Sequence, residues 1–149
     1  MASLASGYEK IDPKVSSEPV WITFDRKGQM VNLGGKINES NYLETYAKDF
    51  GHFEIFQDTL SPIIELLNSF SPSDRKLKFL VKDNLKESGR ATRLSYEALC
   101  NGSWIPVDYD LKSNTMECTV PESVEVPFNF ELIISDYSKN TSRRTIRIK

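Results

Sequence analysis

The sequence contains a single histidine, His52, and only two cysteines, Cys100 and Cys118. Hydrolytic zinc sites and nucleophile–base pairs usually draw on several imidazoles, so one histidine excludes most familiar catalytic arrangements. Two cysteines are too few for a metal cluster or a disulfide scaffold, and they leave the redox compartment undefined.

An excess of one charge is also missing, because 19 basic and 21 acidic residues leave a net charge of −2. Binding to a phosphate backbone needs a basic surface, so we expect no nucleic-acid partner. No apolar run reaches the roughly 18 residues that a transmembrane segment needs. Residues 1–8 lack the basic and apolar regions of a signal peptide. Either the protein is cytosolic, or a targeting segment lies elsewhere in a longer chain.

A packed core is nevertheless expected. The 149 residues are 39% hydrophobic and include 8 Phe, 6 Tyr and 2 Trp, a composition far from that of disordered chains. This length suits one ordinary domain or two small ones.

In the second half, apolar and polar residues alternate with a period of two, the pattern of strands with one buried face. Asn101-Gly102 separates two of these runs and favours the positive φ angles of a type I′ hairpin turn. Short strands separated by turn residues predict an antiparallel sandwich. The expected strands are residues 76–82, 93–100, 103–109, 116–120, 128–134 and 145–149.

The first half shows fewer strands. Residues 20–24 and 30–33 flank a turn and predict a hairpin, and residues 53–56 predict a later strand. By contrast, residues 42–50 and 63–70 have apolar side chains at helical spacing, so the local pattern alone predicts two short helices.

Several short motifs together resemble a known family. Residues 58–64 and 77–84, followed by Ser88-Gly89, resemble the DT-x-x-P-x-I … L-x-F-x-x-x-D-x-x-S-G progression of bacterial immunoglobulin-like domains. Residues 101–112 resemble a DGKW-x-x-x-EYD-x-K segment, and residues 132–140 resemble L-x-V-x-D-x-x-GN. This combination is similar to the non-catalytic C-terminal region of lysostaphin-like (LytM-type) zinc endopeptidases of Gram-negative envelopes.

The resemblance covers most of the chain, because residues 5–13, 33–35 and 50–53 follow the same region's order. It departs from the pattern at Asn101, where Asp is usual, and at Ser138-Lys139, where Gly precedes the final Asn.

The resemblance implies an all-β fold. An antiparallel immunoglobulin-like β-sandwich would occupy residues 60–149, preceded by a smaller β unit over residues 1–59. Strands would then replace the two helices, and we adopt strands on the strength of the resemblance. The sequence permits either, because Pro62 can begin an edge strand as readily as a helix.

The resemblance also bears on function. The catalytic domain of these endopeptidases resembles H-x-x-x-D … H-x-H, in which two histidines and an aspartate bind zinc. This chain has His52 alone, too few ligands even for an open catalytic zinc, so we expect no enzyme activity and no cofactor. His52 is interpreted as a surface or turn residue.

We therefore expect a non-enzymatic accessory or binding module of an envelope-associated, peptidase-like protein in an extracytoplasmic space (periplasm or cell envelope). It would position a catalytic domain of the same longer polypeptide or bind cell-wall components. One alternative is an extracellular adhesion or protein-interaction domain that is independent of any peptidase. Another is an enzyme with carboxylate-only chemistry, as in glycoside hydrolysis.

Four aspartates at predicted strand ends are calcium candidates, because calcium favours several hard oxygen ligands: Asp83, Asp108, Asp110 and Asp136. No spacing matches a known calcium loop, and Asp commonly caps turns. Turn capping is therefore the preferred interpretation.

Two tryptophans are binding candidates. Trp21 and Trp104 alternate opposite to the main apolar sets of their strands, so at least one is expected to be exposed. An exposed aromatic ring can stack on a sugar. Packing against a neighbouring domain or under a loop is favoured over stacking, because Trp is highly buried on average.

The two cysteines are predicted to be free, buried thiols. If residues 103–109 pair with both neighbouring strands, Cys100 and Cys118 lie two strand spacings apart, about 9 to 10 Å, beyond disulfide reach.

Overall fold

The computed structural model describes residues 18–89 and 92–149. Residues 1–8 and 5–13, used above for the signal-peptide and family arguments, lie outside the described residues. The prediction of an all-β fold is confirmed, because the described residues form mostly antiparallel strands and no α-helix. Among them, no helix has the length and apolar character needed to cross a membrane. The strands are β1 (Val20–Phe24), β2 (Met30–Gly34), β3 (Lys36–Ile37), β4 (Leu43–Glu44), β5 (Glu54–Phe56), β6 (Ile63–Leu66), β7 (Lys76–Lys82), β8 (Lys86–Glu87), β9 (Ser95–Cys100), β10 (Ser103–Ile105), β11 (Val107–Asp110), β12 (Thr115–Thr119), β13 (Phe128–Ser135) and β14 (Thr141–Ile148).

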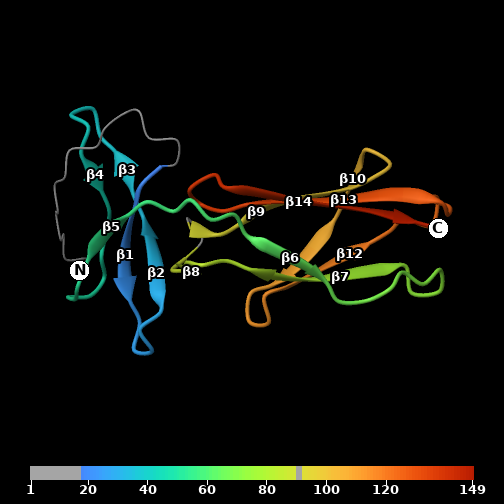
Figure 1. Ribbon diagram of the computed structural model, residues 1–149, viewed down its shortest axis with the longest axis horizontal. Coiled ribbons are helices and arrows are strands. Elements are labelled where there is room, and N and C mark those ends of the chain that lie inside the picture. Colours follow the sequence, from blue (N-terminus) through green and yellow to red (C-terminus); the bar gives the residue numbers. More distant parts are fainter. Residues whose placement is uncertain (1–17, 90–91) are drawn as a thin grey trace. The chain divides into compact units, whose positions relative to one another are not determined.

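The chain divides into two compact units, coloured along the sequence in Figure 1. The first unit contains the described residues up to Leu60, with Asn84–Leu94 and Asp136–Asn140. The second contains Ser61–Asp83, Ser95–Ser135 and Thr141–Lys149. Each unit is therefore assembled from several stretches of the chain.

The first unit is built on a four-stranded sheet with the order β5-β1-β2-β8. The predicted hairpin of β1 and β2 is confirmed. Its turn is held by Asp25, whose Oδ1 accepts hydrogen bonds from the Lys27 and Gln29 amides at 2.8 and 3.0 Å. The β8 strand adds to β2 in parallel. Behind this sheet, the core consists of Val20, Ile22 and Leu85, against which Met30, Phe56 and Tyr137 pack.

The Tyr137 side chain connects the turn at residues 136–140 to Gly35, the residue that follows β2. Its hydroxyl donates to the Gly35 carbonyl at 2.8 Å and accepts from the Gly35 amide at 3.1 Å. A Cβ on Gly35 would lie 2.6 Å from Leu43 Cδ1, and Gly34 has a φ of +71°. Both positions therefore need glycine for the backbone to approach these side chains.

We expect Tyr137→Phe to destabilise the protein by about 1 to 3 kcal/mol, because it leaves two part-buried backbone groups of Gly35 without a partner. The free energy of unfolding in urea measures this loss. Tyr46→Phe is the matched control, since Tyr46 is 76% exposed. Equal stability of the two variants would contradict the assigned role of the Tyr137 hydroxyl.

The second unit contains two four-stranded sheets with the orders β10-β9-β13-β14 and β11-β12-β7-β6. The predicted alternation is confirmed on β7, β12 and β13, where buried residues alternate with more exposed ones. The Phe79 and Phe130 rings, one from each sheet, stack with their centroids 5.4 Å apart. The two sheets thus share a core. Its fully buried side chains include Leu77, Phe79, Met116, Cys118, Phe130, Leu132 and Ile134.

The hairpin turn at Asn101-Gly102 is confirmed, with positive φ angles of 46° and 80° at the two residues. The single strand predicted at residues 103–109 is wrong. Its first half, β10, pairs with β9, whereas its second half, β11, pairs with β12 in the other sheet. Pro106 lies at the break and has no amide hydrogen to donate to a ladder, so the chain changes sheets there.

The two helices suggested by the local pattern are wrong. Residues 61–70 contain strand β6, while residues 40–50 contain only the short strand β4 and then a loop. The helical spacing was misleading because its apolar residues do not share one buried face. Leu43 and Ala47 are buried, but Tyr46 and Phe50 are 76% and 92% exposed.

Candidate functional site

The two tryptophans have different environments. Trp21 is half-buried in the first unit, and its Nε1 donates to the Leu43 carbonyl at 3.0 Å. Trp104 on β10 is 66% exposed. The expectation that at least one tryptophan is exposed is therefore confirmed, and Trp104 is the residue available to a partner.

Trp104 stands on the outer face of the β10-β9-β13-β14 sheet. The strand register places it beside Leu99, and Leu99 beside Glu131 on the next strand. Glu131 in turn forms a salt bridge with Arg143 at 3.0 Å. Since Ala98, Phe130 and Leu132 point into the core on the same strands, this outer row combines one large aromatic ring with hydrogen-bonding side chains.

His52 lies at the surface, as predicted, with its side chain 69% exposed. Its Nε2 lies 2.5 Å from Oε1 of Glu54, the first residue of β5. The His52 ring also lies beside the Phe24 ring, with centroids 6.0 Å apart.

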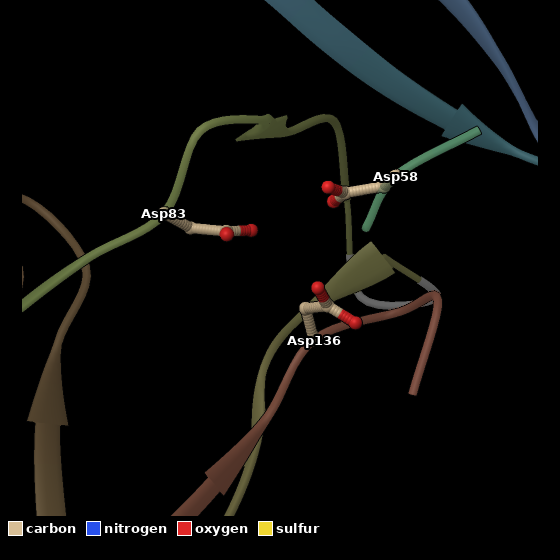
Figure 2. A group of neighbouring side chains, drawn as sticks. All are labelled: Asp58, Asp83 and Asp136. Carbon is tan, nitrogen blue, oxygen red and sulfur yellow. The ribbon is translucent and has the colours of Figure 1, made fainter. Parts of the chain in front are cut away.

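Two carboxylates of the first unit lie close together (Figure 2), with one oxygen of Asp58 within 4.8 Å of one oxygen of Asp136. Asp58 and Asp136 belong to the first unit and are 1% and 4% exposed. Asp83 directly precedes Asn84, whose Nδ2 donates to Asp58 Oδ1 at 2.9 Å. Carboxylate oxygens grouped in this way are the donor set that calcium prefers.

One of the four calcium candidates, Asp136, thus lies in this group, whereas Asp83 belongs to the second unit. Asp108 and Asp110 do not lie in the group either. Asp108 is an exposed residue of β11, and Asp110 caps a turn by accepting from the Lys112 amide at 3.0 Å and the Ser113 hydroxyl at 2.6 Å. Asp58 was missed as a candidate, although it begins the Asp58-Thr59 motif on which the family resemblance partly rests.

Within this group the aspartates also cap turns, which is the interpretation preferred from the sequence. Asp136 Oδ1 and Oδ2 accept from the Asn140 amide and side chain, both at 2.8 Å. Asp58 Oδ1 accepts from the Leu60 amide at 3.1 Å. Burial raises the pKa of Asp136 and the neighbouring Asp58 carboxylate adds to the rise, although the Asn140 bonds oppose it. Two carboxylates buried this close repel each other unless a proton or a cation intervenes.

Asp136 should make stability depend on pH in an unusual direction. Because its pKa is raised by folding, its contribution is fully present at acidic pH and is lost as the pH rises through the folded-state pKa. Relative to Asp136→Asn, we expect the wild type to lose stability as the pH rises above 3.8, the ordinary pKa of an aspartate, measured as the free energy of unfolding with a metal chelator present.

Asp110→Asn is the matched control with the opposite sign. Hydrogen bonds from Ser113 and Lys112 lower the pKa of Asp110, so its contribution is present above the unfolded-state pKa and disappears as the pH falls. The same trend for both variants would contradict the assignment to Asp136. The calcium hypothesis is tested separately by calorimetric titration. Binding heat that the wild type shows and Asp136→Asn lacks would favour a calcium site. If the wild type shows no binding heat, turn capping is the role that stays assigned to Asp136.

The cysteines are free and buried, as predicted, but the reason given for it was wrong. Cys100 lies on β9 and Cys118 on β12, so they belong to different sheets of the second unit and are not two spacings apart in one sheet. Burial raises the pKa of both thiols, that of Cys118 to about 12.

Both thiols should therefore be unreactive in the folded protein, because the thiolate is the nucleophile. Without reductant, a chromogenic disulfide reagent should detect no reactive thiol in the folded protein at neutral pH. After denaturation it should detect two thiols per chain. Fewer than two after denaturation would mean that the cysteines are already oxidised.

Comparisons with known proteins do not identify a family. No protein-family model matches the chain, and a search of curated proteins finds no similar sequence. The function therefore has to be argued from residues and geometry.

Proposed function

We propose that this chain is a non-catalytic module that binds cell-wall components in an extracytoplasmic space, beside a peptidase-like catalytic domain of the same longer polypeptide. The observation that carries the proposal is Trp104, a large aromatic side chain held 66% exposed on a sheet face. Exposed tryptophan is uncommon, because the residue is highly buried on average.

The surroundings of Trp104 suit a polysaccharide. A sugar ring has an apolar face of C–H groups that can lie on an indole, and hydroxyl groups around its edge that need hydrogen-bonding partners. On the outer face of the sheet, Glu131 and Arg143 supply such partners. A sheet face can meet an extended or insoluble chain, which a closed cavity cannot admit.

The accessory role is supported by the sequence. The motifs at residues 58–64, 101–112 and 132–140 resemble the non-catalytic region of envelope zinc endopeptidases, and the chain has one histidine. Too few ligands are then present for a catalytic zinc of that kind. A module without its own chemistry acts by holding a catalytic domain near its substrate.

Sedimentation with insoluble peptidoglycan tests the proposal. We expect the full chain to sediment with the polymer and Trp104→Ala to weaken the binding about 30-fold, the effect of losing one dominant contact of about 2 kcal/mol. Circular dichroism should show an unchanged fold, because Trp104 is mostly exposed.

Ile63→Ala is the matched control, since Ile63 is 57% exposed on β6 of the other sheet, and its binding should be unchanged. Failure of the wild type to bind peptidoglycan or other insoluble polysaccharides would refute the proposal and favour the adhesion alternative. If Trp104→Ala binds the polymer as strongly as the wild type does, Trp104 is not part of the binding site.

A further inference from the structure

The first unit contains a cavity of about 370 Å³, a size within the range of small-molecule sites. Its lining comes from the end of β1, from β2 and mainly from residues 46–53, the loop that follows β4. None of these residues belongs to the acidic group or to the outer sheet face of Trp104.

The loop at residues 46–53 is anchored near both ends. The Thr45 hydroxyl donates to the Leu33 carbonyl at 2.8 Å, and the Thr23 hydroxyl donates to the His52 carbonyl at 2.9 Å. Between these bonds, Ala47 is 3% exposed. The cavity wall is therefore held in place before any ligand arrives, which lowers the entropic cost of binding.

Aromatic rings dominate the exposed part of the lining. Phe50 is 92% exposed, Tyr46 76% and Phe24 41%, and the His52 ring lies beside Phe24. Rings of this size gain much when they are covered, because each can bury about 150 to 250 Å². Such a group around one cavity favours a ligand with flat apolar faces.

The polar part of the lining is balanced in charge. Lys48 and Asp49 both line the cavity and contribute opposite charges. In the part of the chain that the structure describes, neither forms a salt bridge. A phosphate ligand would need an excess of positive charge. A fully apolar ligand would strip water from both charged groups without replacing their hydrogen bonds.

We propose that this cavity binds a neutral saccharide, one or two sugar units at a time. The C–H faces of the sugar lie on Tyr46 and Phe50. Its hydroxyl groups exchange hydrogen bonds with Lys48 and Asp49, which can donate to and accept from the same ligand. The site belongs to the first unit alone and does not depend on binding at Trp104.

The single histidine provides the test, because His52 lines the cavity and its ring signals are the only imidazole signals of the protein. The full chain is titrated with three neutral trisaccharides (triacetylchitotriose, cellotriose and maltotriose) and followed by ¹H–¹³C correlation NMR. We expect saturable shifts of the His52 ring signals with at least one of them. Phe50→Ala and Tyr46→Ala should each weaken that binding about tenfold.

Two control variants test whether the saccharide binds at this cavity and not elsewhere on the protein. Ile37→Ala removes an apolar side chain of the same unit that is 47% exposed and does not line the cavity, so it should leave binding unchanged. Trp104→Ala should also leave the His52 shifts unchanged, whatever it does to peptidoglycan binding.

Three outcomes would overturn the inference. The first is that none of the three trisaccharides shifts the His52 signals at millimolar concentration. The second is that the shifts persist unweakened in both aromatic variants or disappear in Trp104→Ala. The third is an equal or stronger response to trigalacturonic acid, which would replace the neutral ligand with an acidic one.

Discussion

Burial of one face of each strand is the constraint on which the second unit depends. Leu77, Phe79 and Val81 on β7 have to face Phe130 and Leu132 on β13, so every intervening residue is directed outward. Trp104 stands on the outer face for this reason, because the next residue, Ile105, is 2% exposed. The exposure of the candidate binding residue is thus a consequence of how the core is filled.

In the first unit, side-chain hydrogen bonds join distant stretches of the chain. The Tyr137 hydroxyl satisfies both backbone groups of Gly35, and Asn140 Nδ2 donates to the Asp58 carbonyl at 3.0 Å. These bonds join stretches of chain that are far apart in sequence, and they gather Asp58 and Asp136 into one buried environment. The raised pKa of Asp136 follows from that gathering. The turn that caps β13 is therefore also a structural part of the first unit.

The loop at residues 46–53 links a failed prediction to the proposed saccharide site. Its apolar residues have helical spacing, yet Tyr46 and Phe50 are turned to water while Ala47 is buried. A helix with that pattern would have buried one continuous stripe. Here the aromatic side chains surround a cavity instead, and the backbone is held by single hydrogen bonds from Thr23 and Thr45. The spacing of Tyr46 and Phe50 is that of a buried helix face, yet both side chains are exposed. A ligand in the cavity would cover them.

The all-β class was adopted from the family resemblance, because the local pattern alone predicted two helices. The amino-acid pattern was enough to predict most strands of the second unit, the β1–β2 hairpin and the Asn101-Gly102 turn. These depend on the two-residue period and on backbone preferences of neighbouring residues, which are local properties. The three-dimensional arrangement was needed to establish that the chain changes sheets at Pro106, and that Cys100 and Cys118 lie in different sheets. It was also needed to bring Asp58 together with Asp136, and to pair His52 with Glu54 beside a cavity. Those features depend on which strand ends and loops meet, and strand pairing between distant segments is not encoded in the pattern of any one segment.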